Sequence, residues 1–124
     1  MLRFKVSDDT VNKLLAFRSE RKWEKFHTAS NLAKSIAVEA AELLERFQWG
    51  PSIVDITKIE HEVADVLIYL VYFCELTDID IDKIIREKIA INEANYPVEK
   101  NNGICVKERS INGVSGVFGI QDGN

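Results

Sequence analysis

The chain has 124 residues, of which 46% are hydrophobic and 29% are charged, and its formal net charge at pH 7 is −4. A chain of this size and composition fits one compact domain, and the acidic balance gives no electrostatic reason to expect nucleic acid or an anionic membrane as a partner. We expect a cytoplasmic protein, because the longest apolar run, 66–74, is too short to cross a bilayer and the charged N-terminus lacks a signal-peptide core.

Apolar residues that recur every three and four positions predict four helices. The first is expected over about 7–22, and the second from residue 30 or 31 to the breaker pair Gly50-Pro51. The third is expected from Thr57, where Thr57 to Glu60 reads as a capping box, through Leu76, and the fourth starts after Asp80 and ends at Tyr96-Pro97. Short connections favour antiparallel neighbours, so we predict an all-α fold, a four-helix bundle over residues 1–100.

A different composition begins at residue 98, after which five glycines are spread among short apolar stretches. Asn112-Gly113 is a hairpin signal. We therefore predict a short glycine-rich tail, 101–124, that forms a small hairpin or an arm on a neighbouring subunit. Cys74 and Cys105 lack metal-ligand spacing, and we expect both to be reduced, with Cys74 in the core.

Two acidic pairs are the main chemical signal in the sequence. Glu39 and Glu42 lie on the second predicted helix, and Glu62 and Asp65 lie on the third. A three-residue step puts both members of a pair on one helix face, so antiparallel packing would bring four carboxylates together. Such a cluster takes up protons or holds a cation, and oxygen ligands suit Mg²⁺ or Mn²⁺. The alternative is a non-catalytic regulator or assembly subunit with an acidic partner-binding face.

Other site motifs are incomplete. Position 65 is Asp where a zinc-protease helix has its second His, and Lys58 stands where a di-iron bundle needs a Glu three residues before His61. No glycine loop has the strand-to-helix context that cradles phosphates. His61 is therefore expected on an exposed helix face.

The order of several motifs resembles a known family. "EAAE" at 39–42 and "EVAD" at 62–65 resemble the ExxE…ExxD signature of the MazG-like nucleoside triphosphate pyrophosphohydrolases. "RKWEKFH" at 21–27, "ERFQW" at 45–49, "ADVLIYL" at 64–70 and the Lys88, Asn92, Tyr96-Pro97 series resemble its dCTP pyrophosphatase branch. The resemblance covers residues 15–100, most of the helical body.

This resemblance implies Mg²⁺-dependent hydrolysis of a deoxynucleoside triphosphate, dCTP or a relative, to monophosphate and pyrophosphate, by a homodimer or homotetramer. The metal ligands would be Glu39, Glu42, Glu62 and Asp65, with Glu39 or Glu42 activating water. The base pocket would include Trp23, His27 and Trp49, and the phosphates or sugar would meet Lys88, Asn92 and Tyr96. Tyr69 would orient Asp65 or only pack against it.

One departure from the family concerns positive charge. The family pattern carries arginines just before the Tyr-Pro, where this chain has Glu93, Ala94 and Asn95. Neutralisation of the triphosphate would then depend on the metal, on Lys88 and Arg86, or on the tail residues Lys107 and Arg109.

Overall fold

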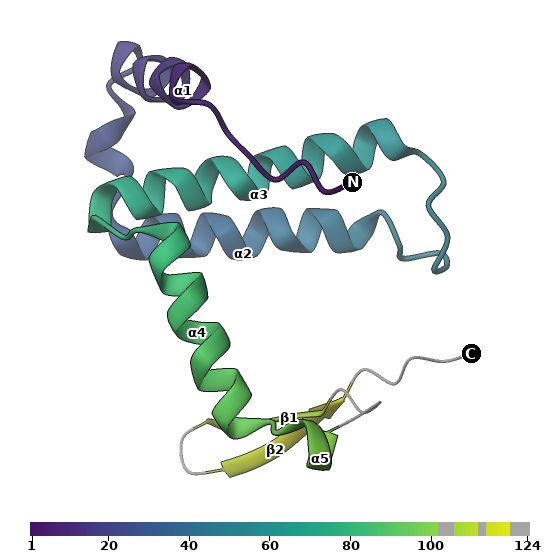
Figure 1. Cartoon of the computed structure of the whole chain (residues 1–124). Coiled ribbons are helices and arrows are strands. Elements are labelled where there is room, and N and C mark those ends of the chain that lie inside the picture. Colours follow the sequence, from purple (N-terminus) through teal and green to yellow (C-terminus); the bar gives the residue numbers. More distant parts are fainter. Residues whose placement is uncertain (102–105, 112–113, 120–124) are drawn as a thin grey trace. The chain divides into compact units, whose positions relative to one another are not determined.

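The computed structural model describes residues 1–101, 106–111 and 114–119, and the chain divides into two compact units, Met1–Asp80 and Ile81–Asn124. The first unit holds α1 (Asp8–Glu20), the 3-10 helix η1 (Trp23–Phe26), α2 (Ala29–Glu45) and α3 (Ile56–Thr77). The second unit holds α4 (Ile81–Asn95), α5 (Val98–Asn101), β1 (Val106–Ile111) and β2 (Val114–Gly119) (Figure 1). The predicted all-α class is confirmed. None of the helices in the described ranges has the length and apolar character needed to cross a membrane.

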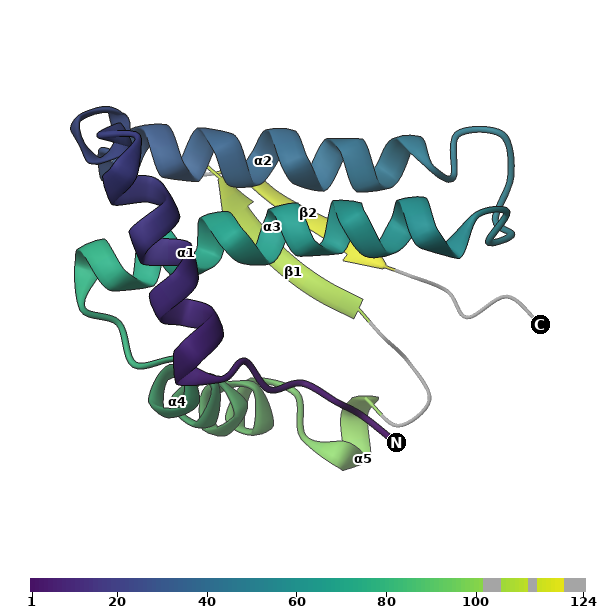
Figure 2. The same cartoon turned by 90° about the horizontal axis from the view of Figure 1, so that it is seen from above.

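The first unit is built on the pair α2 and α3, which lie side by side and run in opposite directions (Figures 1 and 2). A side-chain oxygen precedes each helix: Thr28 accepts from the backbone N–H of Asn31, and Asp55 accepts from that of Lys58. The capping box predicted at Thr57 is wrong, because the Asp55 carboxylate already fills the cap and leaves Thr57 inside the first turn. The predicted antiparallel pair itself is confirmed.

Helix α2 ends at Glu45, earlier than the breaker pair Gly50-Pro51. Its last turn tightens, since the N–H groups of Arg46 and Phe47 donate three residues back, over 3.2 and 2.9 Å. Residues 46–49 therefore form turns rather than helix, and Gly50 follows with a φ of 158°, a value that favours glycine. This irregular stretch positions two side chains of interest, Arg46 and Trp49.

The interior of the first unit is small. Leu32 and Tyr72 are 1% and 3% exposed, and Ile59 is also buried. Other apolar side chains of α2 and α3 stay exposed on a single chain: Val38 (56%), Leu44 (70%), Val63 (40%) and Leu70 (37%). The first unit by itself therefore leaves apolar surface of this helix pair uncovered.

Helix α1 is joined to α3 by a buried arginine. Both Nη atoms of Arg18 donate to one carboxylate oxygen of Glu75 at 3.1 Å, and the guanidinium carbon lies 5.0 Å from the centre of the Tyr72 ring. Arg18 is only 8% exposed. The ring and the carboxylate together compensate its buried charge.

The second unit contains the fourth predicted helix, and α4 ends at Asn95 as the Tyr96-Pro97 pair predicted. Strands β1 and β2 pair in antiparallel register from Val106 opposite Gly119 to Ile111 opposite Val114, which confirms the predicted hairpin. Its turn, Asn112-Gly113, lies outside the described residues, as does Cys105. The division into a helical domain 1–100 and a tail 101–124 stays a prediction.

Two smaller predictions concern α3. His61 is exposed, as expected. Cys74 is a free thiol but only half-buried, and burial raises its pKa.

Candidate functional site

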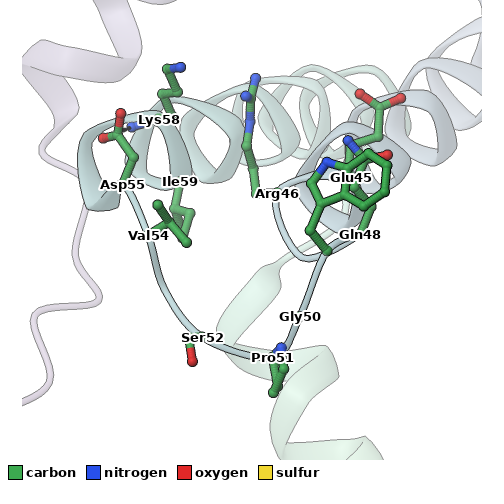
Figure 3. Close-up of a pocket in the computed structure, with 11 residues that line it drawn as sticks. Glu45, Arg46, Gln48, Gly50, Pro51, Ser52, Val54, Asp55, Lys58 and Ile59 are labelled. Atoms are coloured by element: carbon green, nitrogen blue, oxygen red, sulfur yellow. Dashed lines mark hydrogen bonds between the residues drawn. The ribbon is translucent and has the colours of Figure 1, made fainter.

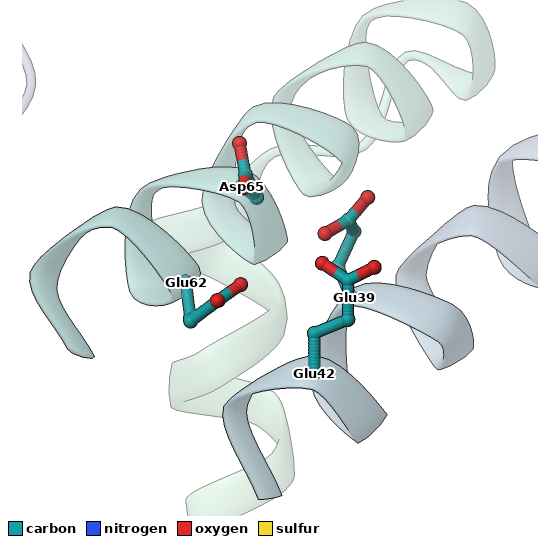
Figure 4. Close-up of side chains that lie close together, drawn as sticks. All are labelled: Glu39, Glu42, Glu62 and Asp65. Carbon is teal, nitrogen blue, oxygen red and sulfur yellow. The ribbon is translucent and has the colours of Figure 1, made fainter. Parts of the chain in front are cut away.

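The four predicted acids come together in the first unit. Glu39 and Glu42 project from α2 toward Glu62 and Asp65 on α3 (Figure 4). One carboxylate oxygen from each residue lies within 4.8 Å of the others. Glu62 is buried and the other three are half-buried. The antiparallel packing thus produces the cluster that the two three-residue steps predicted.

The cluster is electrostatically strained without a cation. Burial raises the pKa of Glu39 to about 7, with further upward contributions from a hydrogen bond with Glu42 and from the charges of Glu42, Asp65 and Glu62. Its Oε2 is buried and has no hydrogen-bond partner. An oxygen-only set that contains an unpartnered buried oxygen fits a hard divalent cation, so these four acids could hold one.

The Glu39 pKa leads to a testable pH dependence. A carboxyl whose pKa is near 7 when folded and near 4.5 when unfolded stabilises the fold fully below pH 4.5, and this stabilisation is lost as the pH rises through 7. In metal chelator, the Tm of the wild type should therefore fall from pH 5 to pH 8 by more than the Tm of Glu39→Gln. Parallel Tm curves for the two proteins would contradict the raised pKa.

A cation already contacts the cluster. Arg46 donates through Nε at 3.1 Å and Nη2 at 2.6 Å to the same oxygen, Oε1 of Glu62. This contact raises the pKa of Arg46 and places its guanidinium at the edge of the acidic group. Sequence reasoning missed this pair, although Arg46 stands seven residues after Glu39 and four after Glu42, a spacing that shares their helix face.

An aromatic group connects the cluster to the segment before α2. Tyr69 lies one turn after Asp65, and its pKa is raised by burial and then by the charges of Glu39, Asp65 and Glu42. The His27 ring lies 6.4 Å from the Tyr69 ring and 5.0 Å from the Tyr72 ring, between centres. The structure therefore places Tyr69 beside the acids and His27 next to Tyr69. Tyr72, which links them, was not predicted.

The surroundings of His27 favour its neutral imidazole form. Burial lowers its pKa, and the nearby Arg18 charge lowers it further. Its Nδ1 is buried without a hydrogen-bond partner. A neutral imidazole with one free nitrogen can donate to or accept from a bound ligand.

The two predicted tryptophans lie at opposite ends of α2. Trp23 precedes this helix, is 41% exposed and meets Phe17 edge to face at 5.6 Å. Trp49 follows the helix and is 93% exposed. Seventeen helical residues separate the ends, which is roughly 25 Å at about 1.5 Å per residue. One chain therefore does not bring Trp49 to Trp23 and His27.

Trp49 instead lines a cavity of about 610 Å³ formed by the end of α2, the connecting loop and the start of α3 (Figure 3). The charged residues of its lining are Glu45, Arg46, Asp55 and Lys58. Glu45 thus lies at this cavity and outside the four-acid cluster. The cavity and the cluster share Arg46 as their boundary.

The remaining predicted residues belong to the second unit. Lys88 and Asn92 lie one helical turn apart on α4, and the Tyr96 N–H donates to the Asn92 carbonyl at 2.8 Å. Lys88 is exposed, whereas Asn92 and Tyr96 are half-buried. Their approach to the acidic cluster stays a prediction. The side chains of Lys107 and Arg109 lie outside the described part of the chain.

Comparison with known sequences finds a matching family and several similar proteins. The model of the MazG-like family matches residues 34–108. The chain is 34% identical over 100 residues to dCTP pyrophosphatase 1 of Rattus norvegicus, covering 73% of this chain and 59% of that protein. It is 37% identical over 90 residues to dCTP pyrophosphatase 1 of Homo sapiens, covering 65% and 53%. The chain thus spans little more than half the length of these curated relatives.

Comparison with solved structures points the same way. A pyrophosphatase from Archaeoglobus fulgidus superposes with a TM-score of 0.69 at 36% sequence identity. The match covers 78% of this chain and 99% of that one.

Proposed function

The chain belongs to the MazG-like family, and from this premise we propose that it hydrolyses a nucleoside triphosphate to the monophosphate and pyrophosphate. The observation that carries the proposal is the convergence of four carboxylates from α2 and α3 within 4.8 Å. The similarity to dCTP pyrophosphatases and to a solved pyrophosphatase supports the same reaction class.

In this proposal the divalent cation is Mg²⁺, with Mn²⁺ as a substitute, and its ligands are Glu39, Glu42, Glu62 and Asp65. When bound, Mg²⁺ supplies a Lewis acid for the phosphate oxygens and offsets charge on the departing pyrophosphate. The unpartnered Oε2 of Glu39 and the mutual repulsion of the acids support this assignment. No nitrogen or sulfur ligand stands in the described cluster, which disfavours zinc.

We assign water activation to one of two carboxylates, Glu39 or Glu42. A water oxygen attacks the α-phosphorus, the bond from that phosphorus to the bridging oxygen breaks, and the proton of the water passes to one of these carboxylates. Glu39 and Glu42 lie one helical turn apart on α2, and each places a carboxylate oxygen within 4.8 Å of the other cluster oxygens, which supports either one as the proton acceptor.

The nucleoside would be recognised beside the acids by His27, Tyr69 and Trp23. The free Nδ1 of His27 and the lowered His27 pKa support hydrogen bonding to a base. The proposed partners of the phosphates or sugar are Lys88, Asn92 and Tyr96, whose four-residue spacing on and just after α4 supports a shared face. We favour dCTP as substrate on the strength of the relatives' names.

A panel of deoxynucleoside triphosphates tests this function. Pyrophosphate release should require Mg²⁺, should be highest with dCTP or a modified dCTP, and should leave the monophosphate as the other product. Glu45→Gln is the matched control, because Glu45 shares α2 with two cluster acids but lies at the neighbouring cavity. No turnover of any nucleotide, together with no effect of Mg²⁺ on Tm, would leave the non-catalytic regulator as the better interpretation.

A homodimer or homotetramer completes the proposed site. The exposed Val38, Leu44, Val63 and Leu70 support assembly through the helix pair. Because Trp49 lies about one helix length from Trp23 in the same chain, it can line the base pocket only if it comes from a second copy.

Two measurements check this assembly. Light scattering should give at least twice the 14.1 kDa chain mass, and Leu44→Glu should shift the protein toward monomer. Trp23→Ala and Trp49→Ala chains should each be impaired, and mixing them should restore activity by forming one intact composite site. A monomer at all concentrations, or mixtures no better than either variant, would contradict the composite pocket.

A further inference from the structure

We infer that Arg46 is an internal counter-ion that competes with the divalent cation for Glu62 and so weakens metal binding. This inference rests on the metal site of the proposed function. Both contacting nitrogens of Arg46, Nε at 3.1 Å and Nη2 at 2.6 Å, donate to Oε1 of Glu62. The Glu62 side chain is only 9% exposed, so this contact is largely shielded from water. Charge-assisted bonds of this length are among the stronger hydrogen bonds in proteins.

The competition follows from the oxygen that the two cations share. Two N–H donors already occupy the lone pairs of Oε1, so a metal ion can use this oxygen only after Arg46 has moved. A metal bound through the other oxygen alone would still lie a few ångströms from the guanidinium charge. Partial burial strengthens the repulsion between the two cations.

The side chain of Arg46 has room to move away from Glu62. It is the residue that follows the last turn of α2, and 37% of its side chain is exposed. Arg46 is one of the residues that line the 610 Å³ cavity, and Glu45 and Asp55 line it as well. Both charges already favour the charged form of Arg46, so they offer it alternative partners when Glu62 turns to a metal.

If Arg46 positioned Glu62 for metal binding, its removal would change the metal affinity in the opposite direction. If Arg46 only held Glu62 in the orientation that binds metal, its removal would weaken metal binding. If Arg46 competes, its removal strengthens metal binding and destabilises the metal-free protein, because Glu62 loses the cation that compensates its buried charge. Metal affinity therefore separates competition from positioning without any measurement of turnover.

The experiment is calorimetric titration of the full chain with Mg²⁺ and with Mn²⁺, at one pH, without nucleotide. We expect Arg46→Gln to lower the Kd for metal about tenfold, and to show a lower Tm than wild type in chelator with a larger rise on metal addition. Arg46→Lys, which keeps the charge but loses the fork of two N–H groups, should fall between them. Lys13→Gln is the control, since it removes one positive charge from an exposed position on α1 and leaves α2 and α3 unchanged, and its Kd should stay within about twofold of wild type.

Each result of the titration either supports or overturns the competition between Arg46 and the metal ion. An unchanged or higher Kd in Arg46→Gln, while wild type binds metal, overturns the competition and leaves the metal site standing. Failure of wild type and both Arg46 variants to bind metal overturns the metal site as well. If Arg46→Gln does not fold, a Kd for Arg46→Lys at or above that of wild type overturns the competition, and a lower one supports it.

Discussion

Glu62→Gln should reduce Mg²⁺-dependent pyrophosphate release by about three orders of magnitude, with little change in the fold. Glu62 is the most buried of the four acids and faces Glu39 and Glu42 across the helix pair. A neutral amide oxygen is a poor substitute for a carboxylate on a hard cation. The introduced amide oxygen can still accept from Arg46, so the substitution leaves a partnered group inside the protein.

The matched control for this variant is Glu60→Gln. Glu60 lies on α3 two residues earlier and is exposed, so its replacement removes the same charge from the same helix away from the cluster. Turnover should stay within about twofold of wild type, and circular dichroism should show both variants folded. Turnover of Glu62→Gln within about tenfold of wild type would remove Glu62 from the metal shell.

The charges around the cluster explain how four acids coexist without a metal ion. Burial and the neighbouring acids raise the pKa of Glu39 to about 7, and the Arg46 guanidinium donates to Glu62 at 2.6 Å. A proton on Glu39 and the guanidinium of Arg46 thus each offset part of the negative charge of the cluster. A divalent cation that binds these acids would displace the Glu39 proton and compete with Arg46, so its binding would exchange charge within the site.

Much of this arrangement follows from the sequence. Two three-residue steps of acids, each on a mostly apolar helix, place the four carboxylates on facing sides once α2 and α3 pack antiparallel. The end of α4 is likewise set by a local sequence signal, because Tyr96 precedes a proline and is driven out of helical geometry. Features that depend on spacing within one element, or on a strong local breaker, were predictable.

What the sequence did not reveal depends on contacts between elements. Arg46 shares a helix face with Glu39 and Glu42, but whether it meets an acid of its own helix or Glu62 is decided by where α2 ends. That end came earlier than the Gly50-Pro51 breaker implied, because a turn of short-range hydrogen bonds intervenes. The opposite positions of Trp23 and Trp49 likewise appear only when the length of α2 is known.

Tyr72 is a second residue that the sequence did not single out, since it is one aromatic within a long apolar stretch of α3. It is 3% exposed. Its ring lies 5.0 Å from His27, 6.2 Å from Tyr69 and 5.0 Å from the Arg18 guanidinium carbon. Tyr72 therefore links α1, the segment before α2 and the acidic side of α3. Its ring packs against the ring of His27.

Tyr72→Ala should lower the free energy of unfolding by about 3 kcal/mol, because it empties a buried ring site and leaves Arg18 without its aromatic partner. It should also raise KM for the preferred nucleotide more than it lowers kcat, since His27 loses its support while the four acids keep theirs. Tyr72→Phe is the control: it keeps the ring that contacts His27 and Arg18, so this variant should lose less than about 1 kcal/mol. Urea unfolding and steady-state kinetics measure both effects. A destabilised Tyr72→Ala with an unchanged KM would confine Tyr72 to the core and separate His27 from nucleoside binding.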